Sequence, residues 1–253
     1  MVAEHSMNIN PDWSVSDIVK ADYRAAEVFR KYGIEYCCGG KWPLRAVCES
    51  KDVDVNVVIA ELKRSLRTIH LPSSLNCEDW NINFLTDYIV NVHHTYLKKA
   101  LPETKDELAR FVENHQARFS YLPELLKAFV ELFNETIPHL QQEETIIFPY
   151  IRQIAHAYNN KESYAALLVR TLRKPVENVM HHEHEYLNKL LGLLRQLTNG
   201  YRAPENACVS HRVVFLKLLE LDNDLVQHLY LENDILFPRA IAMERELLGR
   251  NDP

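Results

Sequence analysis

The chain has 253 residues, a formal net charge of −6 and only 6 glycines, and this combination excludes several classes of protein. The charge offers no basic face for phosphates, and no apolar run approaches the roughly 20 residues that cross a bilayer, so we expect neither a nucleic-acid nor a membrane partner. Scarce glycine beside plentiful Leu, Ala, Glu, Lys and Arg favours helices over hairpins, and we expect an all-α fold.

The N-terminal part predicts a small helical domain over residues 1–75. One helical pattern runs from residue 16 to residue 33, opened by a serine cap and closed by a glycine. A weaker pattern covers about 56–68. Residues 71–74, which contain proline and serine, are the expected linker to the rest of the chain.

The five cysteines are odd in number and irregularly spaced, and no C-x-x-C pair occurs. This argues against a disulfide framework, a zinc ribbon or a thioredoxin motif, and it fits a reducing compartment. Because the N-terminus also lacks the pattern of a secretion signal, we expect a cytoplasmic protein. Cys37 and Cys38 adjoin two glycines. We expect free thiols there, since a disulfide between neighbours is strained, either buried as small side chains or acting as a thiol relay, in docking or in oxidant sensing.

Four long amphipathic stretches follow and predict a four-helix bundle over residues 79–253. They lie at about 79–101, 120–157, 162–198 and 207–248, with short polar or Pro/Gly-containing breaks between them. The end of the first stretch stays open, because the helix either stops at Pro102 or continues to about residue 116.

An internal repeat lies in the second and fourth stretches. Residues 139–149 (HLQQEETIIFP) are matched 89 positions later by residues 228–238 (HLYLENDILFP). In each copy the glutamate follows the histidine by four residues, about one helical turn, so the imidazole and the carboxylate share a face and can reach one metal centre. The Phe-Pro tails predict a kink or helix end with a core phenylalanine, and we assign them no chemistry.

A histidine on the preceding helix completes each half of the repeat. His93 lies 46 residues before His139, and His184 lies 44 residues before His228. Pseudo-twofold folding would bring six ligands to the bundle centre: His93, His139, Glu143, His184, His228 and Glu232. If both glutamates bridge, each of two ions receives two imidazole nitrogens and two carboxylate oxygens, with an oxo or hydroxo bridge as fifth ligand. Such ligation favours iron or manganese over structural zinc, and we predict two iron ions.

Further polar side chains near these ligands are candidates for a supporting role. The carboxylates are either acceptors and proton carriers beside the site or solvated helix surface. His94 is the main competitor of His93 for the place of first ligand. No catalytic residue is predicted. The candidates for a supporting role are Glu135, Glu183, His94 and His115.

These residues resemble the repair of iron centres (RIC) family of hemerythrin-like di-iron proteins over nearly the whole chain. The resemblance rests on both copies of the repeat, on residues 179–185 (VMHHEHE) and above all on residues 29–41 (FRKYGIEYCCGGK). It implies a hemerythrin-like bundle with a non-haem di-iron centre in which His93, His139, His184 and His228 are terminal ligands and Glu143 and Glu232 are bridges. Members of the family tend to have a further histidine three residues after the first ligand. In this chain that position is Tyr96, and His94 is present instead.

The resemblance also implies a function. Members are associated with repair of iron-sulfur clusters damaged by oxidative or nitrosative stress, by donation of iron, and they act as cytoplasmic homodimers. The expected partners are damaged iron-sulfur proteins or the cluster assembly machinery. Two alternatives stay open, a di-iron enzyme that reduces nitric oxide or oxygen and a gas or redox sensor. The N-terminal module favours a donor or a sensor over a stand-alone enzyme.

Overall fold

Helices make up the architecture of the computed structural model, which describes residues 9–36, 40–66, 76–172 and 181–249. These ranges contain no β-strand and only an isolated bridge between Ser14 and Pro43. The expectation of an all-α fold is confirmed. Among the described helices, none is long and apolar enough to cross a lipid bilayer.

The chain separates into two compact units. One comprises Met1–Ser73 with Tyr201–Leu218, and the other comprises Ser74–Gly200 with Leu219–Pro253. The predicted domain limits at residues 75 and 79 stay predictions. The described residues of the N-terminal part of the first unit form four short helices: α1 (Val15–Ala21), α2 (Ala25–Lys31), α3 (Leu44–Ser50) and α4 (Val55–Ser65).

The helical pattern from residue 16 to residue 33 forms two helices, so the prediction of a single helix was wrong. Asp22 ends α1 in an extended conformation, and its carboxylate accepts hydrogen bonds from the backbone and side-chain N–H groups of Arg24. Aspartate competes in this way with the helical backbone. The cap of α1 is Ser14, whose Oγ accepts a hydrogen bond from the first turn at 3.1 Å. Gly33 stops α2 as predicted, with φ of +62°.

A separate hydrophobic core holds the N-terminal helices together. Phe29 and Leu44 are fully buried in it, and burial there raises the pKa of the Cys48 thiol. Cys37 and Cys38 lie outside the described residues, as does the predicted linker. Two residues after Cys38, Gly40 requires the absence of a side chain, because a β-carbon would collide with the backbone of Tyr36.

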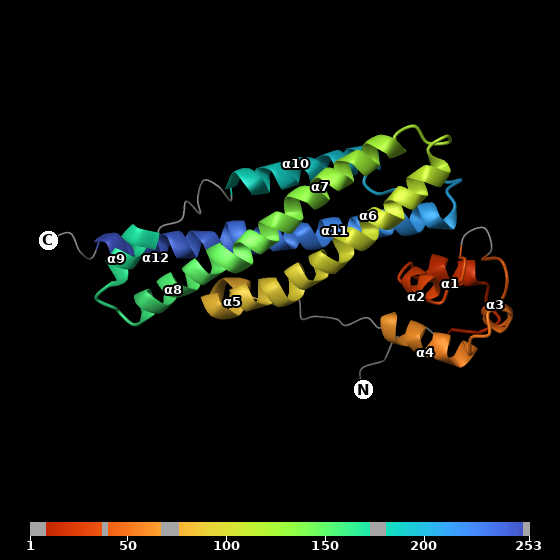
Figure 1. Cartoon of the computed structure of the whole chain (residues 1–253), viewed down its shortest axis with the longest axis horizontal. Coiled ribbons are helices and arrows are strands. Elements are labelled where there is room, and N and C mark those ends of the chain that lie inside the picture. Colours follow the sequence, from red (N-terminus) through yellow and green to blue (C-terminus); the bar gives the residue numbers. More distant parts are fainter. Residues whose placement is uncertain (1–8, 37–39, 67–75, 173–180, 250–253) are drawn as a thin grey trace. The chain divides into compact units, whose positions relative to one another are not determined.

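Long helices form the second unit (Figure 1). Helices α6 and α10 both pack along α7, and the later helices α8, α9 and α12 pack together, with α8 and α9 each against α12. The helices are α5 (Ile82–Tyr88), α6 (Thr95–His115), α7 (Leu122–Gln142), α8 (Phe148–Asn159), α9 (Ala165–Leu172), α10 (His181–Leu197), the part of α11 (Val209–Tyr230) that begins at Leu219, and α12 (Phe237–Gly249). The predicted third stretch therefore contains two described helices, α9 and α10.

Pro102 and Pro138 do not end the helices in which they lie. The first stretch continues through Pro102 to His115, which decides the boundary that the sequence left open. Pro138 likewise lies inside α7. Pro102 is half-buried and Pro138 is exposed, so water can satisfy the carbonyl groups that lose their helical partners.

In the described part of the chain, three of the long helical stretches contain a π-helical segment. They are Ile89–His94 between α5 and α6, Glu143–Ile147 between α7 and α8, and Leu231–Leu236 between α11 and α12. π-Helical segments are rare and occur often at functional sites. Each of these segments contains one of the candidate metal ligands.

Candidate metal centre

Each His-x-x-x-Glu pair spans the junction of an α-helix and a π-helical segment. His139 lies on α7 and Glu143 begins the following π-helical segment, while His228 lies on α11 and Glu232 is in the next π-helical segment. The imidazole Nε2 and the carboxylate Oε1 are 3.1 Å apart in the first pair and 3.2 Å apart in the second. The four-residue spacing thus puts both functional groups on one face.

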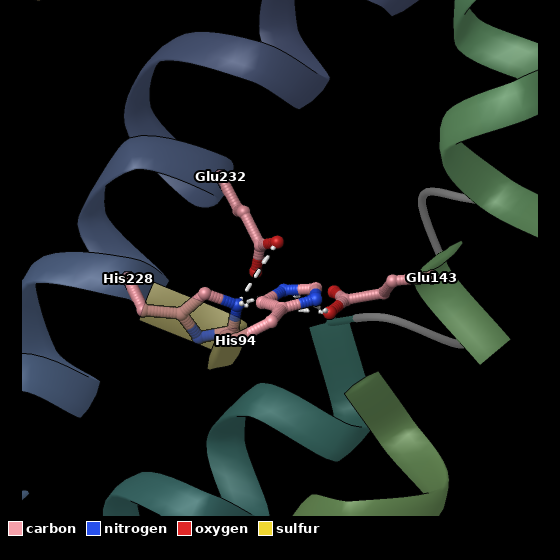
Figure 2. Close-up of side chains that lie close together, drawn as sticks. All are labelled: His94, Glu143, His228 and Glu232. Carbon is pink, nitrogen blue, oxygen red and sulfur yellow. Dashed lines mark hydrogen bonds and ion pairs between the residues drawn. The ribbon is translucent and has the colours of Figure 1, made fainter. Parts of the chain in front are cut away.

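Four histidines and two glutamates meet in two overlapping groups. In each group one ligand atom from every residue lies within 4.8 Å of all the others, and every member is buried. Figure 2 shows the first group, with its side chains turned toward one another. The first group is His94, Glu143, His228 and Glu232, and the second is His139, Glu143, His184 and Glu232.

Each glutamate divides its two oxygens between the groups. Glu143 Oε2 lies 3.4 Å from His94 Nε2 and 3.6 Å from His228 Nε2. Its other oxygen, Oε1, lies 3.1 Å from His139 Nε2 and 3.7 Å from His184 Nε2. Glu143 therefore faces all four imidazoles.

Glu232 is divided in the same way. Its Oε1 is 3.2 Å from His228 Nε2, and its Oε2 is 3.5 Å from His184 Nε2. Both carboxylates are therefore oriented to connect the two groups, as a bridging ligand requires.

The separations within each group match the edges of a metal coordination shell. Atoms bound at about 2.0–2.2 Å from one ion and roughly 90–120° apart lie about 2.8–3.8 Å from one another. The imidazole nitrogens are 3.1 Å apart in the first group and 3.0 Å apart in the second, and the distances from nitrogen to oxygen run from 3.1 to 3.7 Å. The residues present fit a bound metal.

Three of the four imidazoles donate their Nδ1 proton to an acceptor outside the two groups. The Nε2 atom of each of these imidazoles then faces the centre. An Nε2–Nε2 contact of about 3 Å requires either a proton between the two nitrogens, as in an N–H···N hydrogen bond, or a metal ion that takes the place of the proton. The donor and acceptor pairs are His94 with Glu144 at 2.8 Å, His139 with Glu183 at 2.7 Å and His184 with Asn233 at 2.8 Å.

Buried carboxylates give independent support for a cation. Glu143 and Glu232 are fully buried, and none of their four oxygens has a hydrogen-bond partner in the described part of the chain. Removing a carboxylate from water is very costly unless a cation lies beside it, and at this centre the cation is either a metal ion or the protonated imidazoles. Imidazole nitrogen and carboxylate oxygen together suit iron, whereas structural zinc prefers sulfur and nitrogen.

Metal binding at the centre is coupled to the loss of protons from its imidazoles. Burial lowers the pKa of His139 and His228, but the charge of the adjacent Glu143 and Glu232 outweighs burial and raises each pKa to about 10. Burial likewise opposes ionisation of Glu143, yet its imidazole neighbours hold its pKa well below the usual value. A metal that binds these nitrogens must displace their protons.

On the first helix the structure places His94, and not the predicted His93, in the group. Successive helical residues point about 100° apart, so only one of the two can face the centre. His93 is also buried, but its Nδ1 hydrogen-bonds Asp224 Oδ1 at 3.0 Å. Spacing contained the signal, because His94 lies 45 residues before His139, closer than His93 to the 44 residues of the other half. We therefore take His94 as the candidate ligand.

The remaining candidates have different surroundings. Glu183 accepts a hydrogen bond from His139, as its position beside His184 suggested. Glu135 is exposed. His115 donates to the carbonyl of Phe111 at 2.9 Å and lies at the end of α6, about 31 Å along the helix from His94 at the usual rise per residue. It is outside both groups.

Two kinds of supporting residue were not predicted. The residue after each repeat glutamate, Glu144 or Asn233, is an acceptor for an imidazole. The phenylalanine of each Phe-Pro tail stacks on an imidazole in the same half of the repeat. The ring centroids of Phe148 and His94 are 5.6 Å apart, and those of Phe237 and His184 are 5.8 Å apart. The repeat itself was the signal, since both features recur in each copy.

Comparison with known families agrees with this geometry. The sequence profile of the hemerythrin HHE cation-binding domain matches residues 85–240, more than half of the chain. The chain belongs to the hemerythrin-like family. A second profile, ScdA_N, described as a domain of unknown function (DUF542), matches residues 11–66 of this hemerythrin-like protein.

Similar proteins identify the branch of the hemerythrin-like family to which this chain belongs. The iron-sulfur cluster repair protein YtfE of Escherichia coli O81 (strain ED1a) is 31% identical over 236 residues, which cover 92% of this chain and 98% of the relative. The YtfE proteins of Escherichia fergusonii and of Escherichia coli O1:K1 are similar to the same extent. The protein is thus a member of the RIC family, as the resemblance predicted, and its buried His/Glu group is a metal-binding site suited to iron.

The stability of the metal-free RIC protein is expected to fall as the pH rises from about 6.5 to about 10. In the folded chain His139 and His228 have pKa values of about 10, whereas an unfolded histidine titrates near 6.5. A raised folded-state pKa stabilises fully below the unfolded value, and this stabilisation is lost as the pH approaches the folded value. Denaturant unfolding of chelator-treated protein at several pH values measures the effect.

The matched control for this measurement is Glu143→Gln. The variant removes the charge that raises the pKa of His139 but keeps the size of the side chain. Its stability should therefore change less over the same pH range. A pH dependence equal to that of the unaltered chain would contradict the assignment.

Proposed function

We propose that this RIC protein holds two iron ions and repairs damaged iron-sulfur clusters by donating iron. The observation that carries the proposal is the division of each glutamate's oxygens between two imidazole pairs. One ion would bind His94 and His228, the other would bind His139 and His184, and Glu143 and Glu232 would bridge them.

The number of ligands supports release as well as binding. Each ion would receive two nitrogens and two oxygens from the chain, and an oxo or hydroxo bridge would supply one more ligand. Incomplete protein ligation with open positions is typical of non-haem iron sites that react with or exchange ligands. An acceptor's ligand could then reach the iron before all protein ligands have left.

The names of the relatives support the proposed kind of iron acceptor. Relatives that share nearly the whole length of this chain are called iron-sulfur cluster repair proteins. We propose damaged iron-sulfur proteins as the acceptors, and a cytoplasmic location and a homodimer as the family resemblance implies. Light scattering of the purified full chain, with an expected mass of twice 29.6 kDa, tests the oligomeric state.

Transfer of labelled iron tests the proposal. The chain loaded with ⁵⁷Fe and reduced to the ferrous state is mixed anaerobically, in the presence of a reductant, with an iron-sulfur enzyme whose cluster has lost iron by oxidation, and the re-isolated enzyme is examined by Mössbauer spectroscopy. We expect ⁵⁷Fe in the rebuilt cluster and recovery of enzyme activity. The control is an equal amount of free ferrous iron beside a chelator that traps iron in solution. If the acceptor gains no more label than in the control, the donor proposal fails.

The same preparation separates the alternatives. An enzyme would consume nitric oxide or oxygen repeatedly with added reductant, faster than free ferrous iron, while retaining its metal. A sensor would bind the gas reversibly without net reaction. Either result, together with absence of iron transfer, would replace the donor function.

A further inference from the structure

The repeat makes the surroundings of the two proposed iron positions comparable residue by residue. The equivalent pairs are His94 with His184, His139 with His228, Glu143 with Glu232, Glu144 with Asn233, and His93 with Glu183. The last pair consists of the residues that immediately precede the first histidine of each half. Under pseudo-twofold symmetry, the imidazoles of both iron positions would have equivalent hydrogen-bond acceptors. An acceptor that is missing at one position therefore marks a difference between the two.

One exception occurs, at His228. Its counterpart, His139, donates its Nδ1 proton to Glu183 at 2.7 Å. For His228 the equivalent acceptor would be His93, but the Nδ1 of His93 bonds Asp224 instead. The ring centroids of His93 and His228 are 6.3 Å apart. The Nδ1 atom of His228 is fully buried and has no hydrogen-bond partner in the described residues.

The other imidazole of the same position, on His94, has an acceptor, as its counterpart His184 does. His94 donates to Glu144, whose carboxylate is shared with the ammonium group of Lys98 at 2.6 and 2.7 Å. The counterpart acceptor, Asn233, is a neutral amide, so this pair gives His94 no weaker support than His184. Among the described residues, the difference between the two positions is therefore the missing acceptor of His228 Nδ1.

We infer that the iron held by His94 and His228 is the one released first, and that the iron held by His139 and His184 is retained longer. The inference rests on the proposed two-iron site. An acceptor on the outer nitrogen orients the imidazole and makes its inner nitrogen a stronger ligand, and loss of such an acceptor typically weakens metal binding about 10–100-fold. The weaker position is therefore expected to release iron about 10–100-fold faster.

Transfer of ferrous iron to a coloured chelator in excess tests the inference with the full chain. The unaltered protein should release its iron in two phases of one ion each. In His93→Gln the new side chain can donate to Asp224 and accept from His228 Nδ1, because the glutamate in the equivalent position already reaches its imidazole. The fast phase alone should slow, toward the rate of the slow phase.

A complementary substitution removes an acceptor in the second half of the repeat. Glu183→Leu removes the acceptor of His139 at a half-exposed position and should accelerate the slow phase alone, whereas Glu183→Gln keeps an acceptor and should restore it. Gln227→Ala, an exposed change on α11 next to His228, is the matched control and should leave both phases unchanged. The Glu183 variants test the inference independently if His93→Gln does not load with iron.

The outcomes distinguish this inference from the proposed function. Release of both ions in one phase, or two phases that none of the loaded variants changes, would overturn the inference while leaving a two-iron donor intact. Binding of fewer than two ions by the unaltered chain would overturn the two-iron proposal and the inference with it. Opposite effects of His93→Gln and Glu183→Leu on separate phases would support it.

Discussion

Glu143→Ala is expected to abolish iron binding at both positions. The carboxylate of Glu143 faces all four imidazoles, at 3.1 to 3.7 Å, so its removal takes an oxygen ligand from each group and leaves the buried imidazoles without their nearest negative charge. Iron analysis with optical and Mössbauer spectra of protein from iron-fed cells should show a fall from two ions per chain to none.

Glu232→Ala is expected to have a smaller effect of the same kind. Its carboxylate lies within 3.5 Å of two imidazoles, on His228 and His184, so the remaining groups still include Glu143. Gln141→Ala is the matched control for Glu143, because Gln141 is exposed one helical half-turn away. Two ions per chain in both glutamate variants would exclude the proposed centre.

His94→Ala is expected to lower iron content to about one ion per chain, whereas His93→Ala retains both. His94 directs its Nε2 at the centre, 3.1 Å from His228 Nε2, while His93 is bonded to Asp224. Loss of a direct ligand should weaken that position by more than the roughly 100-fold upper value for an outer partner. Equilibrium titration of metal-free protein with ferrous iron measures the affinity of each position.

The pair of alanine variants is its own control, since the two histidines are adjacent, buried and of equal size. Both substitutions leave a similar cavity and a similar loss of folding stability, which thermal unfolding of the metal-free variants will show. The result opposite to the expected one, with iron lost from His93→Ala and kept in His94→Ala, would restore the ligand set predicted from the sequence.

The repeat carried most of what the sequence determined. An imidazole and a carboxylate four residues apart lie on one helical face whatever the tertiary structure, because helical periodicity alone sets their direction. The recurrence of that pair after 89 residues predicted two matching contributions to one centre. Composition predicted helices, since scarce glycine and abundant helix formers act locally.

Only the tertiary structure decided which first histidine faces the centre. The spacing of His94 to His139 is only one residue closer than that of His93 to the spacing of the other half, and an α-helical pattern extrapolated from either histidine is self-consistent. The π-helical segment that ends at His94 alters the helical phase at this point, and the position of Asp224, 131 residues away, provides a partner for His93. Neither effect is visible in a local pattern.

The tertiary structure also decided which residues hydrogen-bond to the ligands or stack on them. Glu144, Asn233 and the two phenylalanines of the Phe-Pro tails recur in the repeat, but their role depends on which helix packs beside them. The unpartnered Nδ1 of His228 is a difference between halves that are alike in sequence at His139 and His228. The sequence by itself determined which functional groups share a helical face, and packing of distant helices decided which of them meet, because hydrogen bonds between helices depend on positions that no single helix specifies.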